Sequence, residues 1–219
     1  RSTGYRQLQG ADPTDEEVSA RAISRDGRVI VGFSSDAQAF TSQAVKWDDT
    51  GSVIPLPFLS GHQAGVAMAR GVSADGAWIV GICTLEPSAG GGVPVVWDPD
   101  GGVSRLVGPA LDNFGGVAWD VSDDGQTIVG VRGSAQGAFI WTPSTGGVLL
   151  RNYLSSFGID LPSNILLDNA RDVSADGRTI AGVAIVDGIR QTYVVTVPSP
   201  TAVLPLGLLF CLRSRRRSP

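Results

Sequence analysis

Serine, aspartate and glycine occur together in a short phrase that the chain repeats four times. The copies read SRDGRVIVG from Ser24, SADGAWIVG from Ser73, SDDGQTIVG from Ser122 and SADGRTIAG from Ser174. A serine hydroxyl near a carboxylate can act as a nucleophile, but it needs a histidine as its base. The chain has one histidine, His62, which stands at no repeated spacing from the serines. We therefore predict no catalytic residue and expect the phrase to be scaffold.

Each aspartate of the phrase precedes a glycine, and this pair is typical of hairpin turns. Glycine accepts a positive φ, and aspartate hydrogen-bonds to nearby backbone N–H groups. Four equivalent copies describe a repeated structural device, so we interpret the serines and aspartates as turn-capping groups. The aspartates are Asp26, Asp75, Asp124 and Asp176.

A second set of residues, which could bind a ligand, stands three positions before each serine. It comprises Arg21, Arg70, Trp119 and Arg171. Guanidinium groups bind anions in bidentate fashion, and an indole ring stacks on flat partners. If these side chains converge, we expect a site for an anionic group or a sugar acid, formed by guanidinium contacts and ring stacking. We favour the alternative, in which each arginine pairs with an acid of the neighbouring repeat, for example Asp120 or Asp172.

Tryptophans and acids gather where the third expected strand of a repeat ends. Trp47, Trp97 and Trp141 could form a platform for sugars, but we favour packing between repeats, with each N–H donating to a turn carbonyl. Asp98 and Asp100 in WDPDGG resemble the start of a calcium loop, but the copies WDDTGS and WTPSTGG do not keep the carboxylates. We predict a turn there, with no metal and no cofactor.

The spacing of the phrase indicates a repeat architecture, because its copies start 49, 49 and 52 residues apart. The first repeat contains four short runs, ARAIS, RVIVGF, QAVKW and SVIPL, separated by turn signals. Four antiparallel strands per repeat match one blade of a β-propeller. We predict an all-β, propeller-like domain of about four blades over residues 20–197. The first strand of each blade would lie innermost and would carry the arginines and the tryptophan.

The two ends of the repeat array are atypical. Repeat four has no fourth strand before Pro198, while GYRQLQG (Gly4–Gly10) is a spare strand, followed by an acidic loop that ends at residue 19. We expect the N-terminal strand in residues 1–19 to complete the last blade, either in a four-bladed ring or as part of a larger one. The segment SSFGIDLPSNILLDN is expected to hold a helical turn.

Charge and cysteine content exclude some classes of function. The chain carries 21 acidic and 17 basic residues, and four of the basic ones lie in the last seven positions. Without those four the charge is −8, which argues against nucleic-acid binding because phosphate contacts need clustered basic residues. The two cysteines, Cys83 and Cys211, indicate no disulfide framework.

Residues 198–219 form a proline-led apolar tail that ends in an arginine cluster. The apolar run Ala202–Leu212 has eleven residues, fewer than the roughly 20 that span a bilayer. This pattern is typical of a C-terminal sorting signal whose positive cluster stays on the cytoplasmic side. The residues that carry it are Val197, Pro198, Pro200, Arg215, Arg216 and Arg217.

Two resemblances to known families rest on these motifs. The repeated S-x-D-G-x-x-I-x-G, followed by a strand ending in Trp and a Gly-Gly turn, resembles the HAF-type extracellular repeat family of bacteria from Ala20 to about Val197. The tail is similar to a PEP-CTERM sorting signal, with VPSP where that family has VPEP. These resemblances imply export by a Gram-negative bacterium, location at the cell surface or in the extracellular matrix, and processing of the tail by an exosortase.

We therefore expect a non-enzymatic surface or matrix repeat protein that is a binding or scaffold module, with polysaccharide or another surface polymer as its partner. The alternative is a propeller glycan hydrolase or lyase, which would need a non-repeated carboxylate pair in a central pocket. The glutamates Glu16, Glu17 and Glu86 stand at no predicted central position. A purely structural matrix protein without a ligand is a further alternative.

Overall fold

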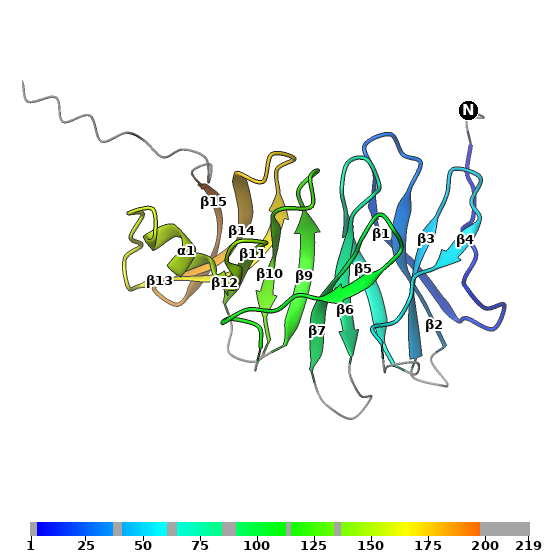
Figure 1. The fold of residues 1–219 in the computed structure, drawn as a ribbon, viewed down its shortest axis with the longest axis horizontal. Helices are drawn as coiled ribbons and strands as arrows, with labels where there is room; N and C mark the ends of the chain where they lie inside the picture. Colours follow the sequence, from blue (N-terminus) through cyan, green and yellow to red (C-terminus); the bar gives the residue numbers. More distant parts are fainter. Residues whose placement is uncertain are drawn as a thin grey trace, which may run out of the picture.

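The chain folds into four antiparallel β-sheets that follow one another along the sequence (Figure 1). A computed structural model describes residues 4–36, 41–60, 65–84, 91–112, 115–133 and 137–197. These residues form fifteen strands and one short helix. The predicted all-β, propeller-like fold with four blades is confirmed.

The first three blades each contain four strands in chain order, as the repeat predicted. The first blade comprises β1 (Glu17–Ile23), β2 (Ile30–Asp36), β3 (Thr41–Trp47) and β4 (Val53–Pro55). The second comprises β5 (Ala67–Val72), β6 (Ile79–Thr84), β7 (Gly92–Trp97) and β8 (Val103–Arg105). The third comprises β9 (Gly116–Val121), β10 (Ile128–Arg132), β11 (Ala138–Thr142) and β12 (Gly146–Leu149).

The fourth blade differs from the others in the way that the sequence predicted. Its three strands are β13 (Ile165–Val173), β14 (Thr179–Val186) and β15 (Ile189–Thr196). The helix α1 (Leu150–Ser155) begins directly after β12, which is earlier than the expected helical turn. Leu150 and Leu154, one turn apart on α1, are buried in the core between the third and fourth blades. This packing places the helix where the sequence has two leucines at helical spacing.

The hydrophobic core is divided into three clusters, one at each junction between consecutive blades. At the first junction, Val31 of β2 and Trp97 of β7 belong to the same cluster. Trp97 is 1% exposed, and its Nε1 donates to the carbonyl of Pro57 at 2.8 Å. The predicted packing between repeats is therefore confirmed for Trp97. Trp47 is also buried, whereas Trp141 is half-buried against the core between the second and third blades.

The repeated phrase forms the same hydrogen-bonded turn in all four blades. In the third copy the Ser122 hydroxyl donates to Asp124 at 2.6 Å and accepts the N–H of Thr127 at 3.0 Å. Asp124 also accepts the N–H of Gln126, and Gly125 adopts a φ of 69°. The other three copies contain the equivalent bonds. The prediction that these serines and aspartates cap turns is confirmed.

These turns also connect neighbouring blades. The Arg25 N–H donates to the carbonyl of Ala74 at 2.9 Å, and the Ala74 N–H donates to Asp123 Oδ1 at 3.1 Å. The Asp123 N–H donates in turn to the carbonyl of Ala175 at 3.0 Å. The phrase therefore fixes the spacing of successive blades as well as the turn within each blade.

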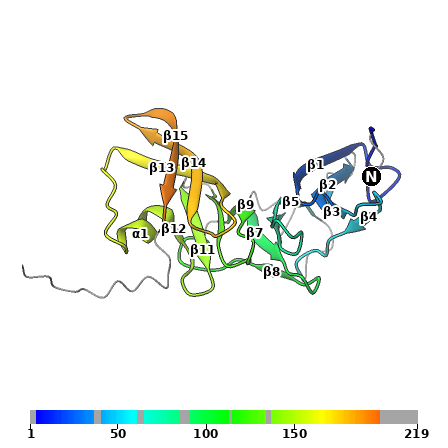
Figure 2. The ribbon, with the colours of Figure 1, turned by 90° about the horizontal axis from the view of Figure 1, so that it is seen from above.

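The N-terminal segment lies against the first blade, so the prediction that it completes the fourth blade was wrong. Residues 4–10 contain no strand. Trp47 Nε1 donates to the Gln9 carbonyl at 2.8 Å, and Arg6 donates to the Asp49 carbonyl at 2.9 Å. A buried indole N–H needs an acceptor, and Gln9 provides it. Seen from above, the described blades form an open arc with the first and fourth blades at opposite ends (Figure 2).

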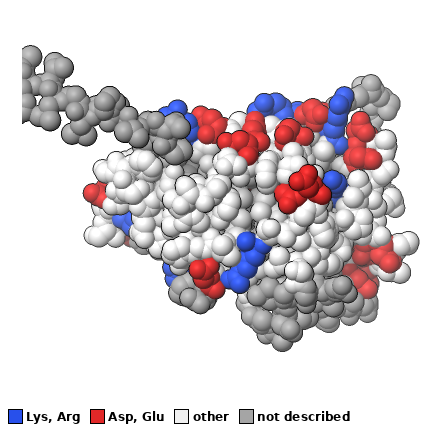
Figure 3. Space-filling view, in the orientation of Figure 1, with Lys and Arg blue, Asp and Glu red and all other residues white. Residues whose placement is uncertain are grey.

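One broad face of the molecule is largely uncharged, and its acidic and basic side chains gather along the edges (Figure 3). On this face the described residues show no continuous basic patch. Among the described residues there is no helix that is long and apolar enough to cross a membrane. Cys83 is a free cysteine that is buried among the described residues. This burial raises the pKa of its thiol.

Candidate functional site

The first strand of every blade contains a β-bulge at the same repeat position. In β1, Ala20 pairs with Gly32 and Ala22 pairs with Val31, so Arg21 is the extra residue of the bulge. A bulge interrupts the regular alternation of a strand and re-aims a side chain. The four extra residues are Arg21, Arg70, Trp119 and Arg171, the predicted ligand-binding residues.

The final glycine of the repeated phrase explains why the bulges form. A β-carbon on Gly81 would lie 2.0 Å from the carbonyl oxygen of Met68, which stands two residues before Arg70. The bulged backbone thus occupies the space that a side chain would need, and the other three blades repeat this close approach. Sequence analysis missed this role, although the signal was a glycine closing every copy. The four glycines are Gly32, Gly81, Gly130 and Gly182.

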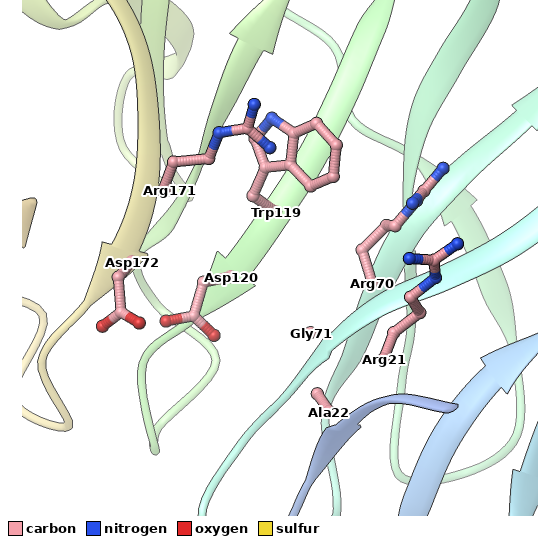
Figure 4. A pocket seen from close by; sticks show the side chains of 8 residues that line it. All are labelled: Arg21, Ala22, Arg70, Gly71, Trp119, Asp120, Arg171 and Asp172. Carbon is pink, nitrogen blue, oxygen red and sulfur yellow. The ribbon is translucent and has the colours of Figure 1, made fainter. Parts of the chain in front are cut away.

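The four bulge residues line one cavity of about 310 Å³, which we call the Arg–Trp cavity (Figure 4). One residue comes from the inner strand of each blade, as expected from their equivalent places in the repeat. The residue after each of them also lines the cavity. The lining consists of Arg21, Ala22, Arg70, Gly71, Trp119, Asp120, Arg171 and Asp172.

Aromatic rings hold the three guanidinium groups at one end of the cavity. The guanidinium carbon of Arg171 lies 4.2 Å from the ring centroid of Trp119, and that of Arg70 lies 5.1 Å from it. Arg21 lies 5.1 Å from the ring centroid of Phe33 in β2. These are cation–π contacts, which orient a guanidinium without neutralising its charge. The indole of Trp119 thus stacks on arginines, a use that the sequence analysis did not foresee.

Two hydrogen-bond donors in the cavity are buried without a partner among the described residues. They are Nε of Arg70 and Nε1 of Trp119. Leaving a buried donor unsatisfied costs about 1–3 kcal/mol, so each such group needs an explanation. Arg105 Nε is a further donor of this kind outside the cavity, whereas the two donors here lie side by side with three guanidinium groups. Burial, followed by the positive charges of Arg21 and Arg171, lowers the pKa of the Arg70 guanidinium. An anion in the cavity would satisfy the donors and offset this repulsion.

The predicted ion pairs between these arginines and Asp120 or Asp172 do not form. Asp120 Oδ2 instead accepts the N–H of Val173 at 2.9 Å across the junction of the third and fourth blades. The ion pairs that the described residues form involve other arginines. In Figure 4 both carboxylates lie apart from the guanidinium groups. The alternative interpretation of the arginines, as partners of neighbouring acids, is therefore incorrect for these two aspartates.

Asp120 and Asp172 form an acidic end of the cavity. Burial raises the pKa of Asp120 to about 6, with smaller contributions from the charges of Asp172 and Asp123, against the lowering effect of backbone N–H groups. The equivalent positions in the first two blades are Ala22 and Gly71. This is a carboxylate pair that the repeat does not generate. From the sequence, both residues were predicted only as partners for arginines.

The remaining predicted sites lie elsewhere. Val197 is buried in the core of the fourth blade, and its N–H donates to the Arg178 carbonyl at 2.7 Å. Within the described residues no group of three His, Cys, Asp or Glu side chains could hold a metal ion. Asp98 Oδ1 accepts the N–H of Gly102 at 2.8 Å, which is the turn that was predicted. Pro198, Pro200, Arg215, Arg216, Arg217, His62, Glu86 and Cys211 lie outside the described residues.

Comparison with known proteins supports the fold. No protein-family model matches the chain, and no curated protein matches it. Prolyl oligopeptidase B from Galerina marginata matches with a TM-score of 0.51 and 10% identity, over 84% of this chain and 26% of that one. A putative TolB from Agrobacterium tumefaciens matches with a TM-score of 0.43 and 16% identity, over 85% of this chain and 61% of that one.

The chain therefore spans less than two thirds of the length of either protein. Both of these proteins contain β-propellers. At 10% identity the likeness to prolyl oligopeptidase B concerns the fold alone, and it agrees with the four consecutive blades described above. The chain has a β-propeller-like repeat fold.

Proposed function

We propose that the chain is a non-enzymatic binding module that holds an anionic saccharide, such as a sugar acid of a polysaccharide, in the Arg–Trp cavity. The observation that carries this proposal is the pair of buried, unpartnered donors, Arg70 Nε and Trp119 Nε1, beside three guanidinium groups. Carboxylate and sulfate groups accept hydrogen bonds from guanidinium in bidentate geometry. The volume of about 310 Å³ is at the small end of ligand pockets, which suits one sugar residue.

A calorimetric titration tests the binding of anionic saccharides. Glucose 6-sulfate and oligogalacturonates are titrated into the protein and into the Arg70→Ala variant. We expect the variant to bind about tenfold or more weakly, because a charge-assisted hydrogen bond contributes about 1.5–3 kcal/mol. Arg28→Ala is the matched control, since it removes the same charge from an exposed pair with Asp26 outside the cavity.

The titration also has an outcome that excludes the proposal. If the protein binds neither the sulfated sugar nor the uronates, or if Arg70→Ala and Arg28→Ala bind them equally, the cavity is not the binding site. A Trp119→Phe variant adds a narrower test, because it keeps an aromatic ring beside Arg171 and removes the indole N–H. We expect its affinity to lie between those of the other two variants.

A glycan hydrolase or lyase is a second candidate function, and the carboxylate pair favours it. Glycoside hydrolysis uses two carboxyl groups, one of which acts as an acid with a raised pKa. Asp120 has such a pKa, raised to about 6, and lies beside Asp172 in the cavity. Release of reducing ends from a polyuronate that is lost in Asp120→Asn would establish this candidate. Binding without any release supports the binding module.

We also propose that the protein is exported to the surface or extracellular matrix of a Gram-negative bacterium. The support is the resemblance of the repeats and of residues 197–219 to exported families, including the cluster Arg215–Arg217. Cell fractionation tests this proposal with the chain expressed in such a host. The protein should reach the surface fraction, and replacing the three arginines by alanine should retain it in the membrane or the cell. An intracellular location of the unaltered chain would contradict it.

A further inference from the structure

The Arg–Trp cavity has a positively charged end and a negatively charged end, and the two ends are formed by different sets of blades. The guanidinium groups gather around Trp119 at one end, and the carboxylates of Asp120 and Asp172 lie together at the other (Figure 4). The arginines come from three blades, whereas both acids come from the third and fourth blades. A ligand that fills the cavity therefore meets positive charge on one side and negative charge on the other.

The acidic end lacks a cation among the described residues. Asp120 accepts hydrogen bonds only from backbone N–H groups, that of Val173 among them, and Asp172 forms no hydrogen bond or ion pair within the described part of the chain. Asp120 is half-buried and Asp172 is exposed, and the nearby charge of Asp172 disfavours the ionised form of Asp120. A bound ammonium group would relieve this repulsion, because its positive charge attracts both carboxylates and it donates up to three hydrogen bonds.

The second blade cannot supply an equivalent acid. Gly71 lies where β5 meets β9, and a β-carbon there would be 2.5 Å from the Trp119 carbonyl oxygen and 2.9 Å from the Asp120 α-carbon. The packing of β5 against β9 thus excludes a side chain at the position that carries Asp120 in the next blade. The separation between the acidic and basic ends is built into the junction between these blades.

We infer that the ligand of the Arg–Trp cavity is a zwitterion of about one sugar residue, namely an amino sugar that also carries an anionic group. The anionic group meets Arg21, Arg70 and Arg171, and the ammonium group meets Asp120 and Asp172. This inference rests on the proposed binding function and names its ligand class. An anionic sugar without the amine binds only the basic end, so it binds more weakly.

The test compares three sugars that share one anionic group. Glucose 6-sulfate, glucosamine 6-sulfate and N-acetylglucosamine 6-sulfate are titrated into the full chain near neutral pH. We expect glucosamine 6-sulfate to bind about tenfold or more tightly than the other two, as one charge-assisted contact would produce. The N-acetyl sugar controls for the nitrogen atom, since it has the same position but no positive charge.

Two variants assign the preference to the acidic end. Asp172→Asn should reduce the preference for glucosamine 6-sulfate to about twofold or less while leaving the affinity for glucose 6-sulfate unchanged or higher. Asp100→Asn is the matched control, because it removes a carboxylate from an exposed turn outside the cavity. Its preference should equal that of the unaltered chain. If Asp172→Asn is poorly folded, Asp120→Asn serves in its place, since asparagine retains an acceptor for the Val173 N–H.

The outcomes separate this inference from the function on which it rests. If none of the three sugars binds, the proposed function fails. If all three bind equally, or if the preference survives in both acid variants, the function stands and the zwitterion inference is overturned. N-desulfated heparin and its N-acetylated derivative repeat the comparison with a polymer. Preference for the free-amine polymer assigns the ligand to a polysaccharide, and preference confined to the monosaccharide assigns it to a free sugar.

Discussion

The surroundings of an aspartate in this chain decide whether the pKa of its carboxyl group is lowered or raised. In the repeated turns, a serine hydroxyl and backbone N–H groups lower the pKa of Asp75 and Asp176. In the cavity, burial dominates and raises the pKa of Asp120 to about 6. Asp75 and Asp176 are therefore ionised turn caps, whereas Asp120 is a carboxyl group that takes up a proton more readily. Position in the repeat separates these two roles, although the residue type does not.

Asp120 predicts a particular dependence of stability on pH. Its pKa is raised in the folded state, so the folded chain binds more protons than the unfolded chain between about pH 4 and about pH 6. The stability of the native protein relative to Asp120→Asn should therefore fall as the pH rises through this range. The full difference, about 1–3 kcal/mol, should be reached above about pH 7.

Urea unfolding at several pH values measures this difference. The Asp100→Asn variant is the control, and its difference from the native chain should not follow the same curve. A difference between native chain and Asp120→Asn that is constant with pH, or that has the opposite sign, would contradict the burial of an ionisable Asp120.

At the scale of the strand, the site depends on a glycine that touches no ligand. The bulge in β5 requires Gly81, because its missing β-carbon leaves room for the Met68 carbonyl. Gly81→Ala should therefore close or displace the bulge and move Arg70 out of the cavity. We expect a destabilisation of about 1–3 kcal/mol and a loss of affinity for glucose 6-sulfate of about tenfold or more.

Gly65→Ala is the control for this element, since its added β-carbon would come no closer than 3.1 Å to the Thr84 hydroxyl. Urea unfolding and titration of the folded variants provide the two measurements. If Gly81→Ala matched Gly65→Ala in both stability and affinity, the glycine would have no part in positioning Arg70.

Strands could be predicted from the sequence because each depends on local signals. Runs such as RVIVGF are rich in β-branched residues and follow an Asp-Gly turn, so β2 forms where it was expected. Segments whose place depends on partners were harder to predict. Gly4–Gly10 has the composition of a strand, but its backbone meets the buried Trp47 indole, which the sequence could not reveal. The bulges were not predicted either, because they result from contact between two strands, and the closing glycine of each copy was their signal in the sequence.

At the scale of the whole molecule, the site is assembled from one residue of each blade. The three core clusters and the linked turns hold the four blades in an arc (Figure 2), and the first strand of each blade contributes residues to the cavity. The repeat spacing was enough to predict that Arg21, Arg70, Trp119 and Arg171 converge. It could not predict that the Trp119 ring contacts Arg70 and Arg171, because this contact depends on how neighbouring blades pack.

The central claim is that the Arg–Trp cavity binds an anionic ligand through its buried donors. An NMR titration with glucose 6-sulfate tests it directly, because the chain has five tryptophans and each has one indole N–H signal. The Trp119 signal is assigned by its absence in Trp119→Phe. Trp47 and Trp97 already donate to backbone carbonyls, so their signals should stay in place.

The signal of Trp119, whose Nε1 lacks a partner among the described residues, should shift progressively and reach a limit as the sugar saturates the protein. A titration in which the Trp119 signal remains fixed, while other signals show that the sugar is bound, would contradict the claim.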